Sequence, residues 1–101
     1  TCVRVPVLRA HSESVVIETE EKLTVLEAKQ LLEAFPGIQL QDTQDPGKHP
    51  MPWEVSQSLN THVGRVREDL SFENGLSLWI VADQLLKGAA WNAVQIAKLF
   101  F

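Results

Sequence analysis

The segment that decides the fold runs from residue 73 to residue 83 and reads Glu-Asn-Gly-Leu-Ser-Leu-Trp-Ile-Val-Ala-Asp. Its middle is nearly all apolar, which is typical of a strand covered on both faces, so we expect a central strand at about 76–82. Asn and Gly tolerate positive φ, and the opening Glu-Asn-Gly therefore predicts a hairpin turn from a strand at about 62–67. Asp83 is the expected N-cap of a helix that follows.

That helix is expected from about residue 84 to 101, and its composition is unusual. Lys87, Gln95 and Lys98 form a narrow polar stripe, and nearly all other positions are apolar or small. A helix this apolar normally packs between two layers. A chain of 101 residues hardly supplies a second layer, so this helix indicates a missing partner or domain.

The amino-terminal half predicts strands around one well-specified helix. Residues 2–10 read Cys-Val-Arg-Val-Pro-Val-Leu-Arg-Ala, and the alternating valines predict a strand, with an edge position or a bulge at Pro6. A second extended run is expected at 14–19. A capping box, Thr-Val-Leu-Glu, opens a helix at Thr24, and the Phe-Pro-Gly that ends at Gly37 closes it, because glycine accepts the unusual dihedrals beyond a helix end.

A short strand at 38–41 and a proline-rich loop at 42–52 complete the pattern. The chain is therefore expected to be an α+β domain with a mixed, mostly antiparallel sheet and helices on one face.

Composition excludes several classes of function. The chain has 101 residues, a formal net charge of −4, 45% hydrophobic and 22% charged residues, one cysteine and five scattered glycines, which fits one small globular domain. No glycine-rich nucleotide loop can be written, the acidic balance argues against nucleic-acid binding, and no apolar run approaches a membrane span. The three histidines lack metal-ligand spacing, so no metal site is expected. The chain begins at Thr1 without a methionine, and we expect a processed or truncated piece of a longer protein.

Few side chains stand out as chemical candidates. His11 ends the first predicted strand and is a possible general acid or base, or else a half-buried structural histidine. Arg4 interrupts an apolar strand, where it either captures a carboxylate or phosphate or forms a surface ion pair, and Arg9, Arg65 and Arg67 compete for that role. Cys2 is expected to be a small buried residue, since nothing nearby in sequence would lower its pKa.

Three ordered blocks resemble one family, the aspartate-semialdehyde dehydrogenases. Residues 2–15, reading Cys-Val-Arg-Val-Pro-Val-Leu-Arg-Ala-His-Ser-Glu-Ser-Val, resemble the motif around the catalytic histidine. Residues 63–71 (Val-Gly-Arg-Val-Arg-Glu-Asp-Leu-Ser) and 74–96, with Ala-Asp-Gln-Leu-Leu-Lys-Gly-Ala-Ala near the middle, resemble later blocks in the same order. The resemblance implies a fold like the C-terminal domain of glyceraldehyde-3-phosphate-dehydrogenase-like enzymes.

The resemblance also implies a reaction and a set of site residues. Enzymes of this family interconvert aspartate β-semialdehyde and β-aspartyl phosphate with NADP and phosphate, in the cytoplasmic biosynthesis of lysine, threonine and methionine, and they assemble as homodimers or higher homo-oligomers. His11 matches the acid/base residue, and Arg4 matches the arginine that binds the substrate's α-carboxylate. Gln84 matches a position that contacts NADP, and Asn92 is a weaker candidate for the same neighbourhood.

Spacing imposes a condition on a shared site. Arg4 and His11 are seven residues apart, so in a regular strand they would lie on opposite faces and about 23 Å apart. A bulge or a strand end is therefore expected between Pro6 and His11.

The departures from the family pattern set the expected domain organisation. The NADP-binding Rossmann domain and the segment with the cysteine nucleophile are absent, so the isolated chain is expected to be inactive. Residues 1–83 would belong to the catalytic and dimerisation domain, and the helix at 84–101 would pack on the absent NADP-binding domain. Two alternatives are a stand-alone, non-catalytic dimerisation or regulatory module derived from the enzyme, and an unrelated small binding domain. The latter leaves the three ordered blocks unexplained.

Overall fold

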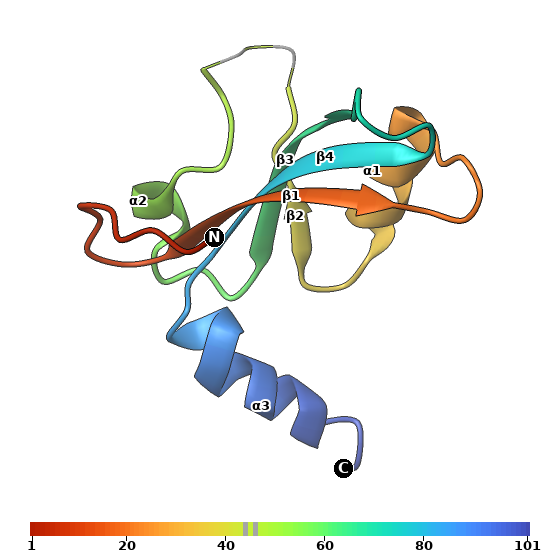
Figure 1. The fold of residues 1–101 in the computed structure, drawn as a ribbon. Helices are drawn as coiled ribbons and strands as arrows, with labels where there is room; N and C mark the ends of the chain where they lie inside the picture. Colours follow the sequence, from red (N-terminus) through yellow and green to blue (C-terminus); the bar gives the residue numbers. More distant parts are fainter. Residues whose placement is uncertain (44, 46) are drawn as a thin grey trace.

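The computed structural model describes residues 1–43, 45 and 47–101 of the chain. Within these residues four strands form one mixed sheet in the order β1-β4-β3-β2, in which only β2 and β3 pair parallel. The elements, in chain order, are β1 (His11–Glu18), α1 (Val25–Ala34), β2 (Ile38–Leu40), α2 (Pro52–Val55), β3 (Thr61–Glu68), β4 (Gly75–Ala82), the π-helix η1 (Leu86–Ala90) and α3 (Trp91–Ala97) (Figure 1). The expected α+β class with a mixed sheet is confirmed.

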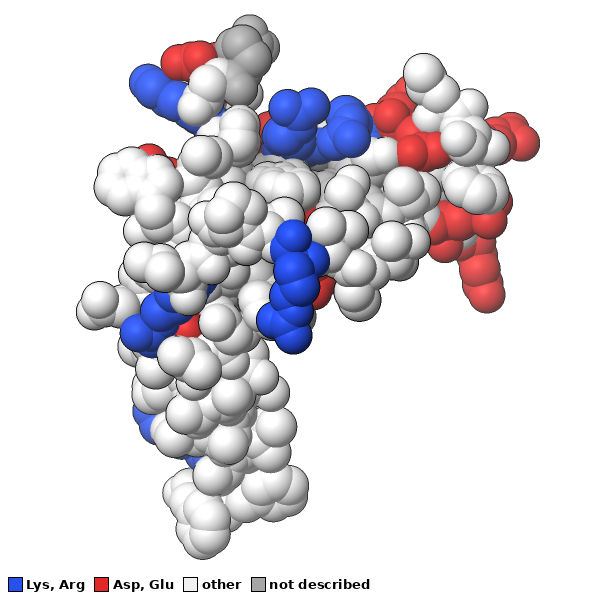
Figure 2. Space-filling view, turned by 60° about the vertical axis from the view of Figure 1, so that its left-hand side comes forward, with Lys and Arg blue, Asp and Glu red and all other residues white. Residues whose placement is uncertain are grey.

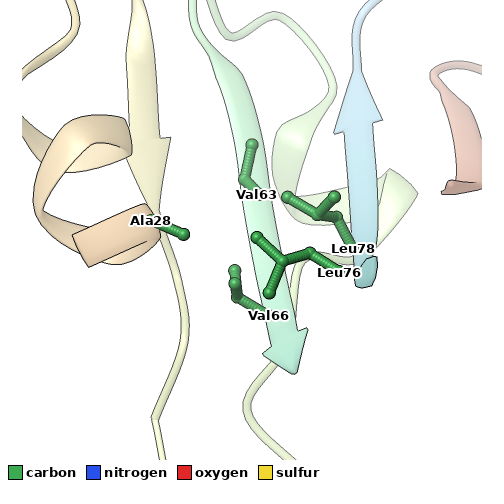
Figure 3. Close-up of a cluster of buried hydrophobic side chains, with 5 residues drawn as sticks. All are labelled: Ala28, Val63, Val66, Leu76 and Leu78. Atoms are coloured by element: carbon green, nitrogen blue, oxygen red, sulfur yellow. The ribbon is translucent and has the colours of Figure 1, made fainter. Parts of the chain in front are cut away.

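The main core lies between α1 and one face of the sheet. Thr24 caps the helix as expected, because its hydroxyl oxygen accepts from the Glu27 N–H at 3.2 Å and the Glu27 carboxylate accepts from the Thr24 N–H at 2.9 Å. Gly37 follows the helix with φ of 83°, also as expected. The side chains buried under α1 come from α1, β3 and β4, and they are Ala28, Val63, Val66, Leu76 and Leu78 (Figure 3).

β4 is the central strand that its apolar sequence predicts. It pairs with β1 on one side and with β3 on the other. The hairpin between β3 and β4 is confirmed, but the reason given for its turn is wrong, because neither Asn74 nor Gly75 has positive φ. The connection is instead organised by Asp69, whose carboxylate accepts from the Ser71 N–H at 2.9 Å and from the Ser77 hydroxyl at 2.6 Å.

β3 carries a bulge directly after Gly64. The pairing with β4 shifts by one residue between Gly64 and Arg67, and Arg65 has φ of 53°. Asp42 supplies acceptors for the bulge, because its two carboxylate oxygens bind the N–H groups of Arg65 at 3.1 Å and Val66 at 3.0 Å. Val66 thereby remains in the core while Arg65 is exposed.

The strand expected at residues 2–10 is wrong, since this segment contains no strand. β1 begins at His11, which pairs with Ala82, the last residue of β4. Residues before His11 therefore have no neighbouring strand to pair with, and Pro6 lacks a backbone donor. The three alternating valines of the segment and Cys2 are exposed, which also corrects the expectation that Cys2 is buried.

The other face of the sheet carries a smaller buried cluster near α2. Ala10, Val55 and Val81 form this cluster, and Trp79 packs against it. Trp79 Nε1 donates to the Pro50 carbonyl at 2.9 Å. The four-residue α2 was not predicted. It lies at the end of the expected loop 42–52, of which Gln44 and Pro46 are outside the described residues.

The carboxy-terminal helix is shorter than expected and begins with a wide turn. The Gly88 N–H donates to the Asp83 carbonyl at 2.9 Å, a five-residue step that defines the π-helical turn, and α3 ends at Ala97. The helix projects away from the sheet (Figure 1). No helix in the described part of the chain is long and apolar enough to cross a membrane.

Candidate functional site

His11, the first candidate, lies exposed at the end of the sheet where β1 begins. The preceding residue, Ala10, is only 2% exposed and has φ of 75°. This left-handed conformation costs an L-residue about 1–2 kcal/mol, so the surrounding structure must hold it. The chain thus turns sharply immediately before His11, and the break expected between Pro6 and His11 is confirmed.

Two consecutive residues that follow β4 hold the bend at Ala10. Gln84 Oε1 accepts from the Ala10 N–H at 2.7 Å, and Asp83 Oδ2 accepts from Arg9 Nε at 2.7 Å. Since His11 also pairs with Ala82, the structure brings His11 and Gln84 to the same end of the sheet.

Asp83 is a fully buried carboxylate with a complete set of partners. Burial opposes its ionisation, but hydrogen bonds outweigh that effect and hold the pKa of Asp83 below its usual value. The donors are the Gln57 N–H and Arg9 Nε on Oδ2, and the Leu85 and Leu86 N–H groups on Oδ1. The predicted N-cap is wrong in position, because the helix begins at Leu86 with Leu85 as its N-cap, but Asp83 still accepts from the N–H groups of both residues. Asp83 also joins three segments of the chain through these bonds and those from Arg9 and Gln57.

Arg4 and Asn92 are not drawn into this cluster. Arg4 is exposed in the amino-terminal segment, and among the described residues its guanidinium makes no hydrogen bond or ion pair. Asn92 is exposed on α3, eight residues beyond Gln84, which corresponds to about 12 Å along a helix. Neither side chain shares a hydrogen bond with His11 or Gln84 in the described part of the chain.

The role of Arg9 and Ala10 beside His11 does not follow from the sequence. The sequence predicts Arg9 only as a competitor of Arg4, and Asp83 only as a helix cap. The contact between them joins residues 74 positions apart, so no local pattern identifies it. The one available signal is that Arg9 and Asp83 have opposite charges. Arg9 precedes β1, and Asp83 follows β4.

A second buried polar network surrounds His62. His62 Nε2 lies 2.8 Å from the Ser58 hydroxyl, and Nδ1 lies 2.6 Å from Gln41 Oε1. An amide oxygen only accepts, so Nδ1 carries the proton and Nε2 accepts from Ser58. Burial lowers the pKa of His62, and the nearby Glu54 opposes that shift. The network ties the start of β3 to the residue after β2 and to the loop after α2.

A shallow basic recess of about 340 Å³ lies against the sheet. Its lining residues are Ser14, His49, Arg65, Arg67, Leu78 and Trp79. Acidic side chains instead gather at one end of the molecule, and the projecting helical part carries few charged side chains (Figure 2). Among the described residues no group of His, Cys, Asp or Glu is arranged to hold a metal ion.

Comparison with known proteins decides the family. The family described as semialdehyde dehydrogenase, dimerisation domain, matches residues 1–87. The chain belongs to this family. Its closely similar relatives include the aspartate-semialdehyde dehydrogenases of Bacillus subtilis, 50% identical over 99 residues, and of Aquifex aeolicus, 48% identical over 99 residues. These matches cover 97% and 98% of this chain but 29% of each relative.

Solved structures of the same enzymes share the fold of this family member. A crystal structure of aspartate semialdehyde dehydrogenase II from Vibrio cholerae, complexed with ASA, superposes with a TM-score of 0.88 at 43% identity and covers 98% of this chain and 29% of that one. The enzyme from Francisella tularensis gives a TM-score of 0.80 at 32% identity, with 94% and 28% coverage. The chain thus corresponds to the dimerisation domain of aspartate-semialdehyde dehydrogenases and spans about 29% of their length.

Proposed function

We propose that this chain is the carboxy-terminal part of an NADP-dependent aspartate-semialdehyde dehydrogenase and that it supplies the acid/base residue and the substrate-carboxylate clamp. The observation that carries the proposal is the placement of His11. It is exposed at a strand end, directly after a bend that hydrogen bonds to Asp83 and Gln84 hold, within a chain that matches such enzymes along almost its whole length.

His11 would move protons during the reaction. A histidine exchanges protons near neutral pH, and at this position it would take the proton of the nucleophilic thiol, give it to the aldehyde oxygen as the hemithioacetal forms, and remove it again when that carbon is oxidised. Arg4 would bind the α-carboxylate of aspartate β-semialdehyde through its planar guanidinium. The bend at Ala10 supports a shared site, because it removes the requirement that Arg4 and His11 face opposite sides of one strand.

The residues at this sheet end fit a peripheral contact with NADP. Gln84 Oε1 is occupied by the Ala10 N–H, while its Nε2 remains a donor for a carboxamide or a phosphate. Asn92 is exposed on α3 and offers a second amide. When bound, NADP supplies hydride transfer to or from the substrate carbon. The chain has no glycine-rich loop, so most of the cofactor contacts and the nucleophile would come from another domain, and the isolated chain would be inactive.

Residues 1–83 would form the catalytic and dimerisation domain, and residues 84–101 would pack on the NADP-binding domain. The polarity of the last helix supports this division. Lys87 Nζ donates to Gln95 Oε1 at 2.6 Å, and this polar pair lies beside Gly37 of the sheet domain. Most large apolar residues of the segment are exposed, and they include Leu85, Val94, Ile96 and Leu99. A helix that turns apolar residues outward needs an apolar partner.

The family description also supports assembly into a homodimer or higher homo-oligomer. The biosynthetic role would place the enzyme in the cytoplasm, on the route to lysine, threonine and methionine, with phosphate as the second substrate.

The first experiment is to determine the mass and the amino terminus of the native protein. A chain of several hundred residues agrees with the proposal, whereas a native chain near 11 kDa supports the stand-alone module instead. In the full-length protein, His11→Ala should reduce turnover sharply and leave assembly intact by light scattering. His49→Ala, a histidine remote in sequence, is the matched control. Wild-type turnover in His11→Ala would eliminate the proton-transfer role.

A further inference from the structure

The two residues before His11 are held by the two residues after β4. Arg9 Nε donates to Asp83 Oδ2 at 2.7 Å, and the Ala10 N–H donates to Gln84 Oε1 at 2.7 Å. The first contact restrains the second residue before His11, and the other restrains the residue directly before it. Together they fix the direction in which the chain enters β1 and the position of the His11 backbone that carries the imidazole.

Ala10 is the part of this arrangement that needs support. Its φ of 75° belongs to a region that L-residues rarely adopt, and its side chain is buried against Val55 and Val81. Such a conformation persists only where neighbouring groups enforce it. If Arg9 and the Ala10 N–H were released, the backbone could relax and carry His11 away from its present position.

Asp83 is the centre of the arrangement because it accepts hydrogen bonds from other groups in addition to Arg9. Its carboxylate is fully buried and also accepts from the Gln57 N–H at 2.7 Å and from the N–H groups of Leu85 and Leu86. Gln57 itself has φ of 70°. One carboxylate thus holds the segment before His11, the loop after α2 and the first turn of the carboxy-terminal helix in a single arrangement.

We propose that Asp83 is a positioning residue for His11, acting through the Arg9 guanidinium and the bend at Ala10. The proposal rests on the proposed function, in which His11 is the acid/base residue. Asp83 does not touch the substrate. Its effect is that the imidazole stands at a fixed position relative to the reacting atoms, and a displacement of about 1 Å from such a position lowers turnover by about 100-fold.

The test uses Asp83→Asn and Arg9→Gln in the full-length dehydrogenase. Asn keeps the size of Asp83 and can still accept from Leu85 and Leu86, but its NH₂ group then faces the donors of Arg9 and Gln57. Asp69→Asn is the matched control, because Asp69 is also a hydrogen-bonded carboxylate but lies at the opposite end of β4. We expect kcat to fall about 10- to 100-fold in both Asp83→Asn and Arg9→Gln, with KM nearly unchanged. We expect kcat to keep its wild-type value in Asp69→Asn.

Three further measurements separate positioning from a general loss of structure. The kcat of the double variant Arg9→Gln with Asp83→Asn should be no lower than that of the more impaired single variant. In the His11→Ala background, neither change should lower the residual kcat further. The histidine limb of the pH–kcat profile should shift in Asp83→Asn and in Arg9→Gln but not in Asp69→Asn.

Unchanged kcat in a folded Asp83→Asn, or fully additive losses in the double variant, would overturn the positioning role. If Asp83→Asn does not fold, Arg9→Gln decides, because Arg9 is partly exposed, and wild-type turnover there rejects the proposal. Wild-type turnover in His11→Ala rejects the proposed function instead, so the two failures are distinguishable.

Discussion

Replacing Gly64 by alanine should destabilise the fold through a collision with backbone that cannot move freely. A Cβ atom at Gly64 would stand 2.4 Å from the Gln41 carbonyl oxygen and 2.6 Å from Pro50 Cδ. Ordinary carbon–oxygen contacts are about 3.3–3.6 Å, so these atoms must separate by about 1 Å. The Gln41 N–H donates to the Val63 carbonyl at 2.7 Å, and a movement of that size would break this bond.

The two contributions can be added to give an expected magnitude. Overpacking of a core costs about 1–3 kcal/mol, and loss of one hydrogen bond costs about 0.5–1.5 kcal/mol. We therefore expect Gly64→Ala to lower the free energy of unfolding by about 1.5–4.5 kcal/mol. At about 4–8 °C per kcal/mol for a domain of this size, even the lower value lowers Tm by about 6–12 °C.

Urea and thermal unfolding followed by circular dichroism measure this change. Gly88→Ala is the control, since a Cβ there meets atoms only at 3.5 Å and 3.7 Å. In a helical segment this substitution should be neutral or stabilise by up to about 1 kcal/mol. An unfolding midpoint of Gly64→Ala equal to that of the wild type would refute the steric argument.

Three other changes test separate parts of the fold. Thr24→Ala should lower the free energy of unfolding by about 1 kcal/mol, because it removes the capping box. Thr24→Asn should keep most of that stability, since Asn also caps helices, and urea titration measures both variants. Because burial lowers the pKa of folded His62, the unfolded chain takes up the proton first, so stability should fall as the pH drops below the ordinary value of 6.5. In His62→Gln the free energy of unfolding measured between pH 5 and pH 8 should lose that slope, and an unchanged slope would exclude His62 as its source. Trp79→Phe should cost about 1 kcal/mol or more through loss of the bond to the Pro50 carbonyl, and a urea midpoint equal to that of the wild type would contradict this contact.

Elements with a strong local signal could be predicted from the sequence. Thr24 and Gly37 bound α1 because capping and left-handed termination depend only on nearby residues. β4 could be predicted because a continuous apolar strand needs neighbours on both sides. The segment 2–10 failed because alternating valines specify an extended chain but do not specify a strand with which to pair. α2 has four residues and is too short to show the apolar spacing that predicts a helix.

The candidate site was predictable only in part. A histidine at a strand end attracts attention by its chemistry, but the resemblance to a family assigned roles to Arg4, Gln84 and Asn92. The arrangement that holds His11 depends on Asp83 contacting a residue 74 positions away. Tertiary packing creates such contacts, and a single sequence carries no local mark of them.

The bulge in β3 has a consequence for changes in chain length. Arg65 is the extra residue of the bulge. Val66 stays in the core, and the residue pairs before and after the bulge have the orientation of a regular ladder. Deletion of Arg65 would leave a regular ladder in which Val66 opposes Leu78 and every later residue of β3 keeps its orientation. Gene variants that lose the Arg65 codon can therefore retain the fold, whereas loss of the Val66 codon would place Arg65 at the core position opposite Leu78.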